Sequence, residues 1–315
     1  MKKYTSIKDV ISLPKLVEEA ISLKKDPFAF EQLGKRKVLG MLFFNPSLRT
    51  RLSTQKAALN LGMDVIVMNI SNDGWVLEFE DGAVMENSSA EHVKEAAQVI
   101  SQYCNVLAIR AFAELKNREE DYAEKVISSF VKFATVPVIS LESATGHPLQ
   151  ALADAITIKE FQQKERPKVV LSWAPHPRAL PQAVANSFVE FIKNTDAELV
   201  VTHPKGYELN NEIMEDVPVE YNQNKAFADA DFIYAKNWSS YTEYGKILST
   251  DKNWTITDDK MQLTNNAKFM HCLPVRRNVV VADEVLDGEN SIVIQQANNR
   301  TYAAQIVLKK ILENG

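Results

Sequence analysis

The chain of 315 residues has few cysteines, no long apolar run and no strong excess of either charge. Cys104 and Cys272 are the only cysteines, so the sequence offers neither a disulfide framework nor the ligand spacing of a metal site. The N-terminus lacks the apolar core of a signal peptide, and no apolar run reaches a membrane-spanning length. A net charge of -5 gives no general attraction for nucleic acid or for a membrane surface. These absences favour a soluble, cytoplasmic enzyme.

The chain also lacks the Gly-x-x-x-x-Gly-Lys segment of a nucleotide P-loop. Its positive charge is instead concentrated in a few short segments, of which FFNPSLRTR, at residues 43–51, is the clearest. The apolar run Val38–Phe44 predicts a buried strand, and the Asn-Pro pair after it predicts a turn. We expect Ser47 to be the N-cap of a helix over about Leu48–Leu61.

A strand, a turn and a helix start favour the binding of a small anion, because the first N–H groups of a helix have no internal acceptor. Ser47 and Thr50 add hydroxyl donors, and Arg49 and Arg51 add full positive charge. An ordinary capped helix with solvated arginines is the alternative. The pattern Ser-x-Arg-Thr-Arg directly after an apolar strand favours a phosphate site over that alternative.

Apolar runs and stretches of helical period alternate along the chain. The predicted strands are Val38–Phe44, Val65–Ile70, Val106–Ile109, Val136–Leu141, Val169–Trp173, Leu199–Thr202, Phe232–Tyr234, Lys268–Met270 and Ile292–Ile294. The predicted helices are about Leu48–Leu61, Glu91–Tyr103, Asp121–Lys132, Leu149–Gln163, Pro181–Asn194 and Ala297–Leu312.

Short, continuously apolar strands separated by helices are typical of parallel sheets that are covered on both faces. Two such series predict an α/β protein with two doubly wound parallel-sheet domains and an active site in the cleft between them. Ligands of open parallel sheets bind beyond the carboxyl ends of the strands. Residues at those ends are therefore the candidates for function.

Two further motifs follow predicted strands. Arg110 comes directly after Val106–Ile109, where a solvated strand end would be an equally good explanation of a lone arginine. The segment ESATGHPLQ, at residues 142–150, leads from the next strand into a helix. His147 precedes a proline that suits the first helical position, and Gln150 can both donate and accept one turn later.

Together, SLRTR at 47–51, HPLQ at 147–150 and HCLP at 271–274 resemble the aspartate/ornithine carbamoyltransferase family, in family order and over nearly the whole chain. The resemblance implies a carbamoyl-phosphate-binding domain at residues 1–150, with a C-terminal helix at about 298–315 packing back on it. It implies an acylornithine-binding domain at 151–297. It also implies a homotrimer with shared active sites, and neither cofactor nor metal.

The resemblance assigns roles residue by residue. Ser47, the backbone of Leu48, Arg49 and Thr50 resemble the phosphate cradle for carbamoyl phosphate, which Arg300 also reaches. Thr50, Arg110 and His147 resemble the catalytic donors to the carbonyl oxygen. Gln150 and the backbone carbonyl groups of Cys272 and Leu273 resemble the family's hydrogen-bond acceptors for the amide nitrogen of carbamoyl phosphate. Fixed donors suit this reaction, because negative charge grows on the carbonyl oxygen and then on phosphate.

The segment expected to bind the acceptor amine differs from that of ordinary ornithine carbamoyltransferases, because their Ser-Met-Gly loop is missing here. The segment at 232–240 reads FIYAKNWSS. Lys236 stands near the position where an acidic side chain would pair with the α-ammonium of free ornithine. Cations there suit an α-nitrogen that is acylated and uncharged. These features resemble the N-acetylornithine/N-succinylornithine branch. The candidate contacts to the acylated ornithine are Glu142, His176, Arg178, Lys236 and Arg276. For His176 and Arg178, a rigid proline-bracketed turn with solvated side chains is the alternative.

Two loop residues refine this prediction. Trp75 resembles the residue that reaches into the active site of a neighbouring subunit and contacts carbamoyl phosphate there. Ala90 aligns with a glutamate in acetyl-specific enzymes and a proline in succinyl-specific ones, and it matches neither. Because Ala90 leaves room for a second carboxylate, we expect N-succinylornithine as substrate, with N-acetylornithine as the near alternative.

Two other readings stay open on the sequence alone. Plain ornithine or aspartate carbamoyltransferases use the same cradle but need a different acceptor site. A non-catalytic binding protein could retain the fold, although the intact set of predicted donors argues against it. Arginine biosynthesis is the pathway that the resemblance implies.

Overall fold

The polypeptide forms two units, each built around a parallel sheet, in a computed structural model that describes residues 1–313. Unit 1 comprises Met1–Glu114, Glu119–Leu149 and the chain from Arg300 onward, and unit 2 comprises Leu115–Arg118 and Gln150–Asn299. The long helices α7 (Pro148–Phe161) and α13 (Val293–Leu312) contribute residues to both units. None of the described helices combines the length and apolar character needed to cross a membrane.

The sheet of unit 1 has the strand order β1-β7-β6-β2-β3, and all its neighbouring strands are parallel. Its strands are β1 (Lys3–Tyr4), β2 (Val38–Phe43), β3 (Asp64–Asn69), β6 (Val106–Arg110) and β7 (Val138–Glu142). A separate parallel pair joins β4 (Leu77–Glu78) to β5 (Glu91–His92). Apart from α7 and α13, the helices between Met1 and Leu149 are η1 (Ile7–Asp9), α1 (Leu13–Lys25), η2 (Glu31–Leu33), α2 (Arg49–Asn60), α3 (Ile70–Asp73), α4 (Val93–Ile100), α5 (Arg118–Tyr122) and α6 (Lys125–Phe133).

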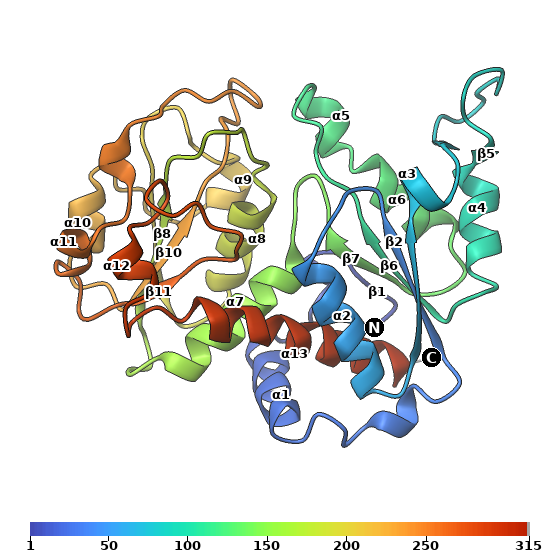
Figure 1. Cartoon of the computed structure of the whole chain (residues 1–315), viewed down its shortest axis with the longest axis horizontal. Helices are drawn as coiled ribbons and strands as arrows, with labels where there is room; N and C mark the ends of the chain where they lie inside the picture. The colour runs from blue at the N-terminus through green and yellow to red at the C-terminus, as the bar shows by residue number, and fades with distance from the viewer. Residues whose placement is uncertain (314–315) are drawn as a thin grey trace. The chain divides into compact units, whose positions relative to one another are not determined.

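Helices cover both faces of this sheet. On one face, Val93 and Ala97 of α4 and Phe130 of α6 pack in one core with Leu107 and Ile109 of β6. Helices α1, α2 and α13 pack together elsewhere in unit 1, where the Asn60 amide donates to the side chain of Gln305 at 3.0 Å. Figure 1 shows α2 and α4 on opposite sides of the strands.

The sheet of unit 2 has the strand order β11-β10-β8-β9, again parallel throughout. Its strands are β8 (Lys168–Trp173), β9 (Glu198–Thr202), β10 (Phe232–Lys236) and β11 (Lys268–Met270). Its helices, besides α7 and α13, are α8 (Ala183–Ile192), α9 (Asn211–Met214), α10 (Gln223–Phe227), η3 (Lys252–Trp254), α11 (Asp258–Met261) and α12 (Asp283–Leu286). Phe188 of α8 stacks on Tyr234 of β10, whereas Phe227 of α10 and Leu286 of α12 pack in a core with Ile233.

Each sheet has one point at which the strand order reverses. In unit 1 this point lies between β2 and β6, because β3 follows on one side and β7 on the other. In unit 2 it lies between β8 and β10. Ligands of open parallel sheets bind at such points, outside the carboxyl ends of the strands. The predicted α/β class with two parallel-sheet domains is confirmed, and the two reversal points locate the candidate sites.

Several predicted elements differ from the structure. The predicted strand Ile292–Ile294 is wrong, because α13 begins at Val293 and Ile294 is exposed on its surface. A short apolar run cannot by itself distinguish a strand from a buried helix start. The predicted helix Asp121–Lys132 is broken at Glu124, whose backbone is left-handed with a φ of 51°. Helix α1 and strand β1 were not predicted.

The start of α2 also differs by one residue from the prediction. Leu48, not Ser47, is the N-cap, and no side chain caps the helix. The exposed N–H groups of the first turn therefore have no side-chain acceptor from the cap, which keeps that end of the helix suited to an anion.

Candidate active site

The turn after β2 is held by Arg110, the last residue of the neighbouring strand β6. Its Nη1 donates to the carbonyl oxygens of Asn45 and Pro46, at 3.1 and 2.7 Å. The Asn45 side chain accepts in turn from the N–H of Phe112, at 2.6 Å, and the guanidinium of Arg110 lies 4.0 Å from the Phe112 ring centre. Arg110 is therefore part of the framework that shapes the anion-binding turn.

A second nitrogen of Arg110 pairs with Glu142, at the end of β7. Its Nη2 donates to Glu142 Oε2 at 3.0 Å, and His147 Nε2 lies 3.6 Å from the same oxygen. All three side chains are buried, with at most 9% of their surface exposed. The carboxylate thus fixes Arg110 through a charge-assisted hydrogen bond, which is the stronger kind, and it also lies close to His147.

Arg300, on α13, joins the same cluster from the far end of the sequence. Its Nη2 donates to Thr50 Oγ1 at 2.5 Å and lies 3.5 Å from His147 Nε2. Thr50 and Arg300 are both buried. Four of the predicted carbamoyl-phosphate residues therefore lie together, although they come from three separate segments of unit 1: Thr50, Arg110, His147 and Arg300.

The remaining residues of the anion stretch divide into two groups. Ser47 and Arg49 are half-buried at the start of α2, and Leu48 is exposed, as a residue that acts through its backbone can be. Arg51 turns away from this group, because its guanidinium stacks on Phe43 and donates to the side chain of Asn69. The structure therefore gives Arg51 a packing role.

Trp75 and Ala90 lie beside one another at the start of the β4–β5 pair. The Trp75 indole donates to Glu91 Oε2 at 2.9 Å, and the Ala90 N–H donates to the carbonyl of Val76 at 3.0 Å. Trp75 is 58% exposed and Ala90 is also exposed. An exposed tryptophan beside the residue predicted to select the acyl group forms a surface that a second subunit or a ligand can cover.

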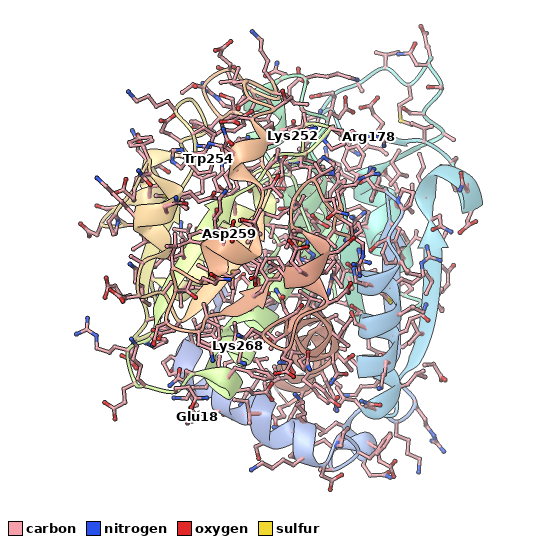
Figure 2. The ribbon with its side chains drawn as sticks, turned by 60° about the vertical axis from the view of Figure 1, so that its left-hand side comes forward. Glu18, Arg178, Lys252, Trp254, Asp259 and Lys268 are labelled. Atoms are coloured by element: carbon pink, nitrogen blue, oxygen red, sulfur yellow. The ribbon has the colours of Figure 1, made fainter. Side chains whose placement is uncertain are left out.

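At the reversal point of unit 2, cations gather around His176. Burial lowers the pKa of His176, a backbone hydrogen bond to Arg178 raises it, and the positive charges of Lys236, Arg276 and Arg178 lower it further. Lys236 is buried at the end of β10, whereas Arg178, labelled in Figure 2, is exposed, as is Arg276. The structure thus brings four of the predicted acylornithine contacts together, and it places the fifth, Glu142, in the cluster of unit 1.

Arg277, next to Arg276 in the sequence, is by contrast paired with two carboxylates. Its guanidinium donates to Asp283 at 2.8 Å and to both carboxylate oxygens of Asp287 at 2.7 Å. Hydrogen bonds to Asp287 and Asp283 raise the pKa of Arg277. No carboxylate of the described residues forms an ion pair of this kind with its neighbour Arg276, which leaves that cation open to an anionic ligand.

The segment after β11 carries Cys272 and Leu273. The Leu273 N–H donates to His271 Nδ1 at 2.8 Å, and Leu273 has a left-handed backbone with a φ of 56°. The Cys272 thiol is a free, buried group. Its backbone, like that of Leu273, is positioned by the turn, which fits the prediction that both residues act through carbonyl oxygens.

Two polar residues of unit 2 were missed by the sequence reasoning. Asp154 and Gln296 are fully buried, and both are connected to Gln150 through hydrogen bonds. The i, i+4 spacing of Gln150 and Asp154 on one helix was a usable signal. The described residues contain no group of three or more His, Cys, Asp or Glu side chains placed to hold a metal ion.

Two family models match the chain. The carbamoyl-P binding domain of aspartate/ornithine carbamoyltransferase matches residues 2–160, and the Asp/Orn binding domain of the same family matches residues 181–311. The chain belongs to the aspartate/ornithine carbamoyltransferase family. The buried donors of unit 1 therefore lie in the segment that matches the carbamoyl-P binding domain, apart from Arg300.

Individual members of the carbamoyltransferase family differ in their similarity to this chain. An N-succinylornithine carbamoyltransferase from Bacteroides fragilis (strain 638R) is 54% identical over 100% of this chain and 99% of its own length. An N-acetylornithine carbamoyltransferase from Xanthomonas axonopodis pv. citri (strain 306) is 33% identical over 94% of this chain and 92% of its own length. Among solved structures, a glutamate-to-alanine mutant of N-acetyl-L-ornithine transcarbamylase complexed with carbamyl phosphate and N-succinyl-L-norvaline has a TM-score of 0.93. It is 32% identical and covers 99% of this chain and 100% of that chain.

Proposed function

We propose that this carbamoyltransferase moves the carbamoyl group of carbamoyl phosphate to the δ-amine of N-succinyl-L-ornithine. The products are N-succinyl-L-citrulline and phosphate, and arginine biosynthesis in the cytoplasm is the proposed setting. The observation that carries the reaction type is the buried cluster of Thr50, Arg110, His147 and Arg300 in unit 1.

The chemistry needs stabilisation of negative charge more than it needs a nucleophilic side chain. The neutral amine of the substrate attacks the carbonyl carbon, the bond to phosphate breaks, and the amine loses one proton. Arg110, His147 and Thr50 donate to the carbonyl oxygen as it becomes negative, and Arg49 and Arg300 donate to the leaving phosphate. The departing phosphate is the proposed acceptor of the proton. Because these donors are buried, their charges are weakly screened by solvent.

The acyl group is proposed from two features. His176, Arg178, Lys236 and Arg276 form a set of cations in unit 2 that suits the α-carboxylate and a second carboxylate. Ala90 adds neither negative charge nor bulk beside Trp75, where the Glu91 carboxylate already accepts from the indole, so residue 90 itself does not repel a succinyl carboxylate. The 54% identity to an N-succinylornithine carbamoyltransferase, against 33% for an N-acetylornithine enzyme, supports this choice. Acetylornithine stays the near alternative, because a small side chain at Ala90 also admits the smaller acyl group.

The proposed assembly is a homotrimer in which Trp75 completes the active site of a neighbouring subunit. Exposed apolar side chains support a contact surface on unit 1: Leu48, Leu52 and Leu59 are 57–66% exposed along α2. Ile66 is 46% exposed on β3, which is an edge strand. Contiguous exposed apolar side chains are typical of protein–protein contacts. Light scattering or sedimentation of the purified protein should give three times the mass of the 35.5 kDa chain.

Turnover with competing amines tests the proposal directly. The protein is incubated with carbamoyl phosphate and either ornithine, N-acetylornithine or N-succinylornithine, and the citrulline product and phosphate are quantified. We expect the highest kcat/KM with N-succinylornithine. Fastest turnover of free ornithine would end the acyl proposal. Tight binding of carbamoyl phosphate without turnover of any amine would support the non-catalytic alternative instead.

A further inference from the structure

The side-chain amide of Gln150 is hydrogen-bonded through its nitrogen but not through its oxygen. Its Nε2 donates to Asp154 Oδ1 at 2.7 Å, one turn further along α7. Gln150 is 1% exposed, and its Oε1 has no hydrogen-bond partner among the described residues. A buried acceptor without a partner is costly, so its retention indicates a ligand donor at that oxygen.

Asp154 accepts a second hydrogen bond at the same oxygen. Gln296 Nε2 donates to Asp154 Oδ1 at 2.7 Å, and Gln296 Oε1 accepts from the backbone N–H of His271 at 2.9 Å. Asp154 and Gln296 are fully buried and His271 is 4% exposed. A continuous series of hydrogen bonds therefore links Asp154 to the backbone segment that contains Cys272 and Leu273.

The carboxylate determines which way both glutamines face. Because a carboxylate oxygen accepts and does not donate, Gln150 and Gln296 must each present nitrogen to Asp154 and direct oxygen away from it. Tyr234, packed beside Asp154 and Cys272, stays a neutral phenol, because burial and these neighbours raise its pKa well above the ordinary value. An amide or hydroxyl in place of Asp154 would allow either orientation of Gln150.

We propose that Asp154 is the positioning residue for both acceptors of the carbamoyl amide in carbamoyl phosphate. It orients Gln150 so that Oε1 accepts one N–H of the substrate, and through Gln296 and His271 it fixes the carbonyl groups of Cys272 and Leu273. This inference rests on the proposed carbamoyl transfer. It assigns to Asp154 the selection of an amide over a group of the same shape that cannot donate.

Acetyl phosphate is the matched probe, because a methyl group replaces the amide and the phosphate is unchanged. A site built to accept hydrogen bonds rejects an analogue without donors, since its buried acceptors are left unpaired. The measured quantity is the ratio of the two dissociation constants, for carbamoyl phosphate and acetyl phosphate, by calorimetry on the full chain. In the wild type we expect a clear preference for carbamoyl phosphate.

The decisive variant is Asp154→Leu, which has a similar shape but no acceptor. We expect the preference for carbamoyl phosphate to fall by about 10-fold to 100-fold, with acetyl phosphate binding unchanged. Asp154→Asn keeps an Oδ1 acceptor but also allows the reversed orientation of Gln150, so it should restore only part of the preference. The control is Thr157→Val, in the same two-helix contact, where the Thr157 hydroxyl accepts from Asn299 at 2.9 Å without a bond to Gln150. We expect that variant to lower thermal stability and to leave the ratio unchanged.

Three results would overturn the inference: an unchanged ratio in Asp154→Leu, equal weakening of both ligands, or an equal loss of preference in Thr157→Val. If Asp154→Leu does not fold, Gln296→Leu removes only the link from Asp154 to the backbone of His271 and should still reduce the preference for carbamoyl phosphate. An unchanged ratio in Gln296→Leu would also overturn the inference. The assay separates this inference from the proposed function. A wild type that turns over no amine would contradict the function, while the binding ratio would still decide the role of Asp154.

Discussion

The strand order reverses at one point in each sheet, and the arginines at these two points differ in whether carboxylates already pair with them. In unit 1, between β2 and β6, Arg110 is buried and already bonded to Glu142 and to two backbone carbonyls. In unit 2, between β8 and β10, Arg178 and Arg276 are exposed, and no carboxylate of the described residues is paired with them. The first point is pre-organised, whereas the second has cations ready for an incoming anion.

This difference corresponds to the two proposed substrates. Carbamoyl phosphate is a small molecule without a variable group, so its donors can be fixed before it binds. The acyl group in the names of the relatives differs, and exposed arginines adapt to one or two carboxylates more readily than a buried, fully bonded cluster does. Substitutions in the buried cluster of unit 1 should therefore lower the rate for every amine, and substitutions among the cations of unit 2 should change the amine preference.

The largest effect is expected for Arg110. Arg110→Met removes a donor to the carbonyl oxygen, so kcat/KM should fall about 10²–10³-fold with every amine. The change also leaves the buried Glu142 carboxylate without the arginine that neutralises it. The variant is therefore compared with Arg110→Met/Glu142→Gln, in which that negative charge is removed as well. The matched control is Arg51→Met, since Arg51 packs on Phe43 and should leave kcat/KM nearly unchanged. A comparable loss in Arg51→Met would contradict the division of the two arginines.

A smaller effect is expected from a pair of adjacent arginines in unit 2. Arg276→Met should raise KM for the acylated ornithine about tenfold, the cost of one charge-assisted hydrogen bond, and leave carbamoyl phosphate binding alone. Arg277→Met is the control, because Arg277 is engaged by Asp283 and Asp287 and should not change KM. Steady-state kinetics at saturating carbamoyl phosphate measures both. A rise in KM for Arg277→Met and not for Arg276→Met would show that Arg277, rather than Arg276, contacts the acylated ornithine.

The acyl preference is expected to respond more weakly. Ala90→Glu places a negative charge next to Trp75, so the ratio of kcat/KM for N-succinylornithine over N-acetylornithine should fall about fivefold to tenfold. Ala90→Gln has nearly the same size without the charge, and it separates electrostatic repulsion from lost space. An unaltered ratio in Ala90→Glu would show that Ala90 does not face the acyl group.

Much of this architecture could be predicted because the informative signals are local. The continuous apolar runs at Val38–Phe44 and Val169–Trp173 predicted β2 and β8, and the residues just after them predicted both sites. Ile292–Ile294 was misread because three apolar residues have no resolvable period, and α1 was missed because its pattern lay outside the alternating series.

The pairings within the site could not be predicted in the same way. Glu142 was expected to contact the acylated ornithine, and its bond to Arg110 depends on β6 and β7 being neighbours in the sheet. The contact between Trp75 and Glu91 depends on the β4–β5 pair, whose two-residue strands are too short to give a sequence pattern. Composition and motifs select the residues, but the strand order decides which of them meet.

The smallest expected effect is a pH dependence at His176. Burial and the charges of Lys236, Arg276 and Arg178 lower its pKa, so the free protein favours the neutral ring. A bound carboxylate stabilises the imidazolium and raises the pKa again, so binding takes up a proton at pH values between the two pKa values. The affinity for N-succinylornithine should therefore fall roughly threefold to tenfold as the pH rises from about 6 to about 8. His176→Asn, which cannot titrate, should flatten this profile, and calorimetry in two buffers of different ionisation enthalpy should detect the proton only in the wild type. A wild-type affinity that rises with pH would mean that the carboxylates bind away from His176.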